Sequence, residues 1–282
     1  MKIVVCLKPA VVASEFACEA TTGAPIRPER VQISEVDEAA LQTALDLKKS
    51  HNGSQITVLC IADRAAESLL RHTLHAGADH AIKLDVQHGD NIPFDTSAAA
   101  KIAATVIREM KPDLVICGAR SPDHGSGFFP YALAAAMDYP VVAGAVSLTL
   151  EQNRLTTVRK LAQGWRENYR LDLPAVLAVE ADIVQPTHVA VMGRSYREAV
   201  GRTVETWPLD KLGMETCPDS LEQEIELSMP RPRRKTAARS KGGSSRNRLK
   251  RMKGGSDKSE TLEGPPEQLA VEFLQRIRQW QQ

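Results

Sequence analysis

The sequence predicts an α/β protein with a doubly wound, mainly parallel sheet, a β-hairpin insertion and a C-terminal extension. Strand-length apolar runs alternate with helical stripes from Lys2 to Pro140, a pattern typical of parallel strands joined by right-handed helical crossovers. Hydrophobic residues make up 43% of the 282 residues but aromatic residues only 4%. The core must therefore be aliphatic, as in sheets covered by alanine-rich helices.

The alternating part has recognisable element ends. Ser34 is a plausible N-cap, Gly77 a plausible C-cap, and Pro112 stops a helix. Asp37 and Glu38 lie in a first helical turn, where we expect them to complement the helix dipole. The predicted strands are residues 2–8, 56–62, 80–84 and 114–118, and the predicted helices are residues 36–49, 65–76, 96–110 and 127–137.

The pattern changes after Pro140. Residues 146–150 and 154–160 are separated by Glu151-Gln152-Asn153 and predict a β-hairpin. Residues 168–172 and 175–181 continue in extended form, and the second run is expected to rejoin the main sheet. A short helix is predicted at residues 195–200. The predicted division is residues 1–212 as the α/β domain, 213–265 as a flexible linker and 266–282 as an amphipathic helix.

The linker is strongly basic. Residues 231–253 hold eleven Lys or Arg and no acid, whereas residues 1–230 hold 22 Lys or Arg against 30 Asp or Glu. The basic run has no aromatic interleaving, so nucleic acid is not the expected partner. A solvated tether to an acidic partner, or to the acidic body itself, is preferred to a nucleic-acid or membrane arm. The last segment has a helical stripe that we expect to dock on another protein, formed by Leu269, Phe273, Ile277 and Trp280.

One loop could bind an anion. Residues 118–127 read GARSPDHGSG and join a predicted strand to a predicted helix, where free backbone N–H groups can meet a phosphate. Ser126 and Gly127 are best placed for it, and Arg120 or His124 could add charge. The alternative is a plain flexible loop with a helix cap, because this Gly-Ser-Gly is only a weak nucleotide signature.

Other reactive residues favour structural roles. Cys6, Cys60 and Cys117 fall inside predicted strands, where a thiol is usually a small hydrophobic group. The five cysteines contain no CxxC pair, and His72 and His75 lack a third nearby ligand, so neither a disulfide framework nor a metal site is expected. No run of eighteen apolar residues occurs, so no transmembrane segment is expected. Because Met1 is followed directly by a strand-like run, a cytoplasmic location is expected.

Several segments together resemble the β subunit of the electron-transfer flavoproteins. The resemblance covers Met1 to about Leu212. It rests on KIVVCLKP at residues 2–9, VDEAALQTAL at 36–45, AGADHAIKL at 76–84, DLVICG at 113–118 and LPAV at 173–176, in the order and spacing of that family. It implies an adenine nucleotide alpha hydrolase-like fold. It also implies cofactor contacts at Cys6, Ser34, Ile61, Gly118, Ser121, Asp123, His124, Gly125, Ser126 and Gly127.

The nucleotide loop departs from the family pattern. Where the family has Ser-Asn-Gln-Thr against a phosphate of AMP, or of a second FAD, this chain has Ser126, Gly127, Phe128 and Phe129. The backbone amides remain possible donors, but side-chain contacts are lost. AMP binding therefore stays open, with an empty or altered pocket as the alternative. Val191 takes the place of the family's anchoring leucine in a loop that docks partner dehydrogenases, with a buried turn residue as the alternative.

The resemblance implies an electron carrier. It predicts the β subunit of a heterodimer that shares FAD with an α subunit, accepts electrons from a dehydrogenase and passes them to an acceptor such as a quinone reductase. The altered loop and added tail favour a specialised catabolic pathway. No GxSxG, HExxH or Walker loop is present, so the chain is expected to perform no acid/base or nucleophilic chemistry of its own. The alternative function is a non-redox adenine-nucleotide-binding or interaction module on the same fold.

Overall fold

The computed structural model describes most of the α/β region and a small part of the C-terminal segment. The described residues are 1–11, 17–19, 25–26, 31–62, 66–85, 96–123, 125–187, 198–208, 211, 265, 268–271 and 274–275. The chain divides into two units, Met1–Met229 and Pro230–Gln282. The first unit contains the strands and helices of the α/β region, and the second contains the C-terminal helical turns.

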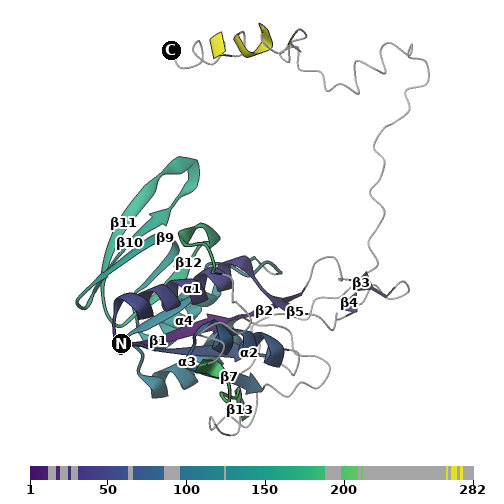
Figure 1. Cartoon of the computed structure of the whole chain (residues 1–282), viewed down its shortest axis with the longest axis vertical. Coiled ribbons are helices and arrows are strands. Elements are labelled where there is room, and N and C mark those ends of the chain that lie inside the picture. Colours follow the sequence, from purple (N-terminus) through teal and green to yellow (C-terminus); the bar gives the residue numbers. More distant parts are fainter. Residues whose placement is uncertain are drawn as a thin grey trace. The chain divides into compact units, whose positions relative to one another are not determined.

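A mainly parallel sheet forms the centre of the first unit (Figure 1). The order of its nine strands among the described residues is β11-β10-β9-β12-β8-β1-β6-β7-β13. In this order, every neighbouring pair from β9 to β13 is parallel, whereas β10 is antiparallel to both β9 and β11. The predicted fold class is therefore confirmed. The strands are β1 Lys2–Leu7, β6 Gln55–Ile61, β7 His80–Asp85, β8 Leu114–Gly118, β9 Val141–Glu151, β10 Arg154–Lys160, β11 Arg166–Asp172, β12 Ala175–Val179 and β13 Glu205–Pro208.

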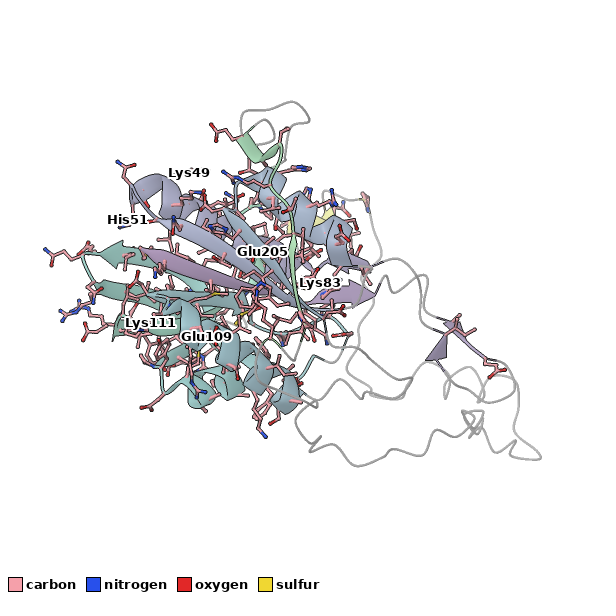
Figure 2. The ribbon with its side chains drawn as sticks, turned by 90° about the horizontal axis from the view of Figure 1, so that it is seen from below. Lys49, His51, Lys83, Glu109, Lys111 and Glu205 are labelled. Carbon is pink, nitrogen blue, oxygen red and sulfur yellow. The ribbon has the colours of Figure 1, made fainter. Side chains whose placement is uncertain are left out.

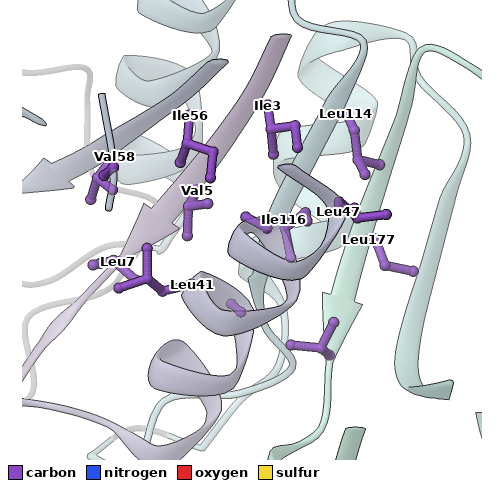
Figure 3. Packing of buried hydrophobic residues seen from close by; sticks show 14 of the residues in the cluster. Ile3, Val5, Leu7, Leu41, Leu47, Ile56, Val58, Leu114, Ile116 and Leu177 are labelled. Carbon is purple, nitrogen blue, oxygen red and sulfur yellow. The ribbon is translucent and has the colours of Figure 1, made fainter. Parts of the chain in front are cut away.

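Helices cover both faces of this sheet. Helices α1 (Glu35–Ser50) and α2 (Glu67–Ala76) pack on one face, and α3 (Thr96–Met110) and α4 (Phe129–Met137) on the other. Figure 3 shows the first core, where Leu41 and Leu47 of α1 lie over aliphatic side chains of β1, β8 and β12. Each fully buried Leu or Ile stabilises the fold by about 1.5–3 kcal/mol, so these two aliphatic layers supply most of the driving force for folding.

Helix ends follow the chemistry that the sequence predicts. The Ser34 hydroxyl accepts a hydrogen bond from the backbone N–H of Asp37 at 3.2 Å, which caps α1. Gly77 ends α2 with φ +127°, a conformation that a side chain would strain. Helix α4 differs from prediction because it begins at Phe129, whereas the predicted helix starts at Gly127. Gly127 has φ +63° and so lies in the preceding loop.

The predicted hairpin is present, and it is continuous with the main sheet. Strand β9 starts at Val141, and its first part pairs in parallel with β12. Its second part pairs antiparallel with β10, and β11 pairs antiparallel with the other edge of β10. Gly144 has φ +81° and stands where β9 changes partner, next to register shifts in both ladders. The hairpin is therefore an extension of the edge of the main sheet.

The sequence did not predict several short strands. Strand β13 pairs in parallel with β7 at the opposite edge of the sheet, where Figure 2 labels Lys83 of β7 and Glu205 of β13. An edge strand of four residues carries no readable alternation, which is why prediction missed it. Two small antiparallel pairs and two 3-10 turns were also missed: β2 Pro9–Val11 with β5 Val31–Ile33, β3 Ala17–Cys18 with β4 Pro25–Ile26, η3 Ala162–Gly164 and η4 Ala181–Ile183.

The remaining predictions fall mostly outside the described residues. The linker at 213–265 lies outside them except for Pro265, and of the helix at 195–200 only residues 198–199 are described as helical. In the second unit, residues 268–271 and 274–275 are helical, with the N–H groups of Gln268 and Leu269 donating to the carbonyl of Pro265. Within the described parts of the chain, no helix is long and apolar enough to cross a membrane.

Candidate functional site

The sheet topology creates a crevice between β1 and β8. From β1 the chain runs through α1 to β6 and through α2 to β7, and α3 then returns it to β8 on the other side of β1. The loops that leave β1 and β8 consequently diverge toward helices on opposite faces. In open parallel sheets, ligands bind beyond the carboxyl ends of the strands at this kind of reversal.

A cavity occupies this crevice. Its volume is about 880 Å³, including the open solvent at its mouth. The ends of β1, β6 and β8 form its floor, α3 forms one wall, and the start of α4 closes it. The surface of the lining is mostly apolar, with polar groups at the strand ends: Cys6, Leu7, Lys8, Asp37, Leu59, Ile61, Thr96, Ala99, Ala103, Cys117, Gly118, Ala119, Arg120, Ser121, Ser126, Gly127, Phe129 and Pro130.

Most of the residues that the sequence assigned to cofactor binding meet here. Those that line the cavity are Cys6, Ile61, Gly118, Ser121, Ser126 and Gly127. Ser34, Asp123 and Gly125 are not in the lining. Ser34 caps α1, Asp123 bonds to a lining residue, and Gly125 turns the loop after β8. His124 lies outside the described residues.

A buried carboxylate joins the two strands of the crevice. The carboxylate of Asp37 accepts a hydrogen bond from the backbone N–H of Lys8 at 3.2 Å, and a second from the backbone N–H of Gly118. A side chain at position 118 would be crowded, because a Cβ there would lie 2.6 Å from Val36 Cγ2 and 2.7 Å from Asp37 Oδ1. Asp37 thus fastens the start of α1 to the ends of β1 and β8.

Burial decides the charge state of this carboxylate. Asp37 is 5% exposed, and this desolvation raises the pKa of its carboxyl group to about 6, although hydrogen bonds from Lys8, Ser34 and Gly118 act in the opposite direction. The floor of the cavity therefore holds a carboxyl group that titrates close to neutral pH. The sequence predicted only that Asp37 complements the helix dipole, whereas the structure shows that its side chain is also buried.

The two cationic side chains in the described part of the lining have acidic partners. Lys8 Nζ lies 2.7 Å from Asp123 Oδ2, and Arg120 Nη2 lies 3.5 Å from Glu180 Oε1. The first pair joins the end of β1 to the loop after β8, and the second joins that loop to the end of β12. The positive charge at the cavity is therefore already balanced within the protein.

The loop after β8 closes largely on itself. The N–H of Gly125 donates to the carbonyl of Ser121 at 2.9 Å, and the N–H of Phe128 donates to the Ser126 hydroxyl at 3.4 Å. Gly127 has φ +63°, and a Cβ on it would come within 3.2 Å of the Ala119 carbonyl, so glycine suits this tight turn. Phe128, at the N-cap of α4, makes no side-chain capping bond.

The cavity thiols are held protonated. Cys6 and Cys117 are direct neighbours in the β1/β8 register, and both are buried free cysteines. Burial, assisted by the nearby Asp37 charge, raises the pKa of Cys6 to about 12, and burial likewise raises the pKa of Cys117 well above its usual value. Because the thiolate is the reactive form, these side chains act as small apolar groups near neutral pH.

Asp37 is the site residue that sequence reasoning missed. Its signal was present, since it stands three, four and seven residues before Ala40, Leu41 and Ala44, on the apolar stripe of α1. Its neighbour Glu38 is exposed on the other side of the helix. An acidic residue on the apolar stripe of a helix that follows a strand end indicates a candidate site residue.

Other predicted sites are only partly described. Of the proposed docking residues, Leu269 is helical, whereas Val191, Phe273, Ile277 and Trp280 lie outside the described residues. Within the described ranges, no group of three or more His, Cys, Asp or Glu side chains is arranged to hold a metal ion. His72 is exposed on α2, and His75 is half-buried.

Similarity to known proteins covers most of the residues that line this cavity. Residues 26–212 match the family described as the electron transfer flavoprotein domain. The chain is 28% identical over 221 residues to the caffeyl-CoA reductase-Etf complex subunit CarD of Acetobacterium woodii, covering 77% of this chain and 82% of that protein. It is 24% identical to the electron transfer flavoprotein subunit beta of Methylophilus methylotrophus, covering 64% of this chain and 69% of that protein. It is 25% identical to the subunit of the same name in Bacillus subtilis, covering 65% and 69% of the two chains.

Proposed function

The chain belongs to the electron transfer flavoprotein family, as a member of its beta-subunit branch, and on this premise we propose the role that it plays in electron transfer. In this proposal the chain forms a heterodimer with an alpha subunit and shares one FAD with it. Electrons enter the flavin from a partner dehydrogenase and leave to an acceptor such as a quinone reductase. A specialised catabolic pathway is the proposed setting.

The match over residues 26–212 carries the proposal, because it spans most of the strands and helices that form the cavity. The three relatives are themselves subunits of electron transfer flavoproteins or of an Etf complex. The chemistry of the cavity agrees with a non-catalytic subunit. Its thiols are protonated, and its cations are already paired with carboxylates.

In this proposal the flavin supplies the redox chemistry, and the protein orients and shields it. Lys8, Arg120 and the amides of Gly125 and Phe128 already bind protein groups, so this proposal assigns most of the flavin contacts to the other subunit. A flavin held mainly by a second subunit needs only one wall from this chain. The proposed contribution of this chain is therefore that wall, together with a rigid scaffold for the other subunit.

Two segments are proposed to dock protein partners. Val191 would anchor a dehydrogenase, and residues 266–282 would pack on the alpha subunit or on the electron donor. The second part is supported by the exposed apolar residues Val271 and Leu274, which are 58% and 56% exposed on the described helical turns. Apolar side chains on a short helix are expected to gain stability by docking.

Co-expression with the alpha subunit from the same organism tests the proposal. We expect a yellow heterodimer whose flavin is reduced by one dehydrogenase and reoxidised by an acceptor. A matched preparation of this chain without the second subunit should be colourless. A colourless heterodimer, or a flavin that no dehydrogenase reduces, would contradict the electron-transfer role.

A second candidate is a non-redox nucleotide-binding or interaction module. It is favoured by one observation, namely that Phe128 and Phe129 stand at the start of α4, where the family pattern has polar side chains. Nucleotide binding by the isolated chain, with no flavin in any complex, would favour this module. Flavin present only in the heterodimer would favour electron transfer.

A further inference from the structure

The charges around the cavity are unfavourable for a phosphate group. Among the described lining residues, Lys8 and Arg120 are the basic ones, and each lies against a carboxylate, Asp123 at 2.7 Å and Glu180 at 3.5 Å. Asp37 adds a third carboxyl group on the floor. Among these groups the cavity therefore has a net charge of about zero with Asp37 protonated and about −1 with it ionised, so a phosphate dianion meets no excess of positive charge.

Two backbone N–H groups of the loop after β8 already have acceptors within the protein. The amide of Gly125 is bonded to Ser121, and that of Phe128 is bonded to the Ser126 hydroxyl. Pro130, the second residue of α4, has no N–H group, so the first turn of this helix lacks one of its usual donors. A helix start normally binds phosphate through several such groups acting together.

The rest of the lining suits an uncharged ligand. Aliphatic side chains from β6 and α3 face the cavity together with the ring of Phe129: Leu59, Ile61, Ala99 and Ala103. The Asp37 carboxylate accepts hydrogen bonds from two backbone N–H groups, and each of its oxygens can accept a further hydrogen bond. An uncharged heterocycle with N–H donors matches apolar walls combined with such an acceptor.

We infer that the cavity selects an uncharged nucleoside or nucleobase and discriminates against the corresponding 5′-phosphate. The Lys8–Asp123 and Arg120–Glu180 pairs are the discriminating elements, because each keeps a cation from a phosphate. This inference deepens the proposed function and rests on it for assigning the cavity to a nucleotide-type ligand. It departs from the AMP site that the family resemblance implies.

Calorimetry on the full-length chain with adenosine and with AMP, near neutral pH, tests the inference. Adenosine should bind at least about tenfold more tightly than AMP, because the phosphate must be desolvated without a free cation. Asp123→Asn and Glu180→Gln each release one cation and should strengthen AMP binding about three- to tenfold, with adenosine binding unchanged. Asp182→Asn is the matched control, since it removes an ion pair with Lys160 that is not part of the cavity lining.

Three results would overturn the inference. They are AMP binding as tight as adenosine binding in the unaltered chain, binding of neither compound, and AMP affinity unchanged in both charge variants. Two variants are used so that a folding defect in one, seen by circular dichroism, leaves the other to decide. Flavin content of the heterodimer is measured on the same preparations, so a failure of nucleoside selection in a yellow, reducible complex leaves the proposed electron-transfer role intact.

Discussion

The ammonium group of Lys8 lies 2.7 Å from the carboxylate of Asp123, which joins the end of β1 to the loop after β8 across 115 residues of sequence. Both side chains are about one-third exposed, at 29% and 31%. Solvent screens such a pair, so its value lies more in holding the loop than in global stability. The pair stands beside the cavity floor, where the N–H of Lys8 also binds Asp37.

Lys8→Met should loosen the loop without unfolding the protein. We expect the free energy of unfolding to fall by less than about 1 kcal/mol, because the pair is screened by solvent. Amide hydrogen exchange in residues 119–127 should become faster. Asp182→Asn breaks a more exposed pair with Lys160, in which the side chains are 53% and 56% exposed, and should leave exchange in that loop unchanged. Equal exchange in Lys8→Met and the unaltered chain would show that the pair does not hold the loop.

Asp37 should make stability depend on pH in a defined window. Its folded pKa of about 6 lies above the ordinary value of 3.8, so the folded state keeps a proton that the unfolded state loses. The contribution of this proton to the free energy of unfolding is complete below about pH 4 and is lost as the pH rises through 6. The free energy of unfolding falls by about 3 kcal/mol over this window. The difference in unfolding free energy between the unaltered chain and Asp37→Asn should therefore fall over this window in urea titrations. A constant difference from pH 4 to pH 7 would contradict the raised pKa.

Gly118→Ala should destabilise the fold by about 1–3 kcal/mol through overpacking. The new Cβ would lie 2.6 Å from Val36 Cγ2 and 2.7 Å from Asp37 Oδ1. Adding Val36→Ala should recover part of the loss, since it removes one of the two clashes but not the other. Urea unfolding of both single variants and the double variant gives the coupling between the sites. Strict additivity would show that the two side chains do not meet.

Cys6 and Cys117 should resist alkylation in the folded protein. Burial raises the pKa of Cys6 to about 12, so at pH 8 its thiolate fraction is on the order of one in ten thousand. Peptide mapping after iodoacetamide treatment should find both residues unmodified in the native chain and modified in denaturant. Rapid native modification of Cys6 at a rate typical of free cysteine would place it in a more open, reactive environment.

Residues 230–282 should contribute to complex formation. Leu274 and Val271 are exposed on the described helical turns, so Leu274→Asp should weaken association with the alpha subunit or the electron donor without affecting the first unit. Deleting residues 230–282 should weaken it at least as much. Titration of the purified partners at physiological salt measures the effect. Unchanged affinity in the deletion variant would show that this segment does not dock on the partner.

The sequence alone determined the alternation of strands and helices and many of their ends. Ser34, Gly77 and the aliphatic runs of β1, β6 and β8 act through local periodicity and capping, which are readable from neighbouring residues. The loop after β8 was also identifiable, because glycine and serine between a strand and a helix form a local pattern. The start of α4 was placed two residues early, since φ at Gly127 depends on its close approach to the Ala119 carbonyl.

The tertiary structure alone decided which of these residues act together. The strand order that opens the crevice between β1 and β8, the burial of Asp37 and the pairing of Lys8 with Asp123 all join segments far apart in the chain. No local pattern specifies such contacts. The same carboxyl group is an ordinary solvated acid or a buried one of raised pKa, depending on whether strand ends and a helix start exclude water around it.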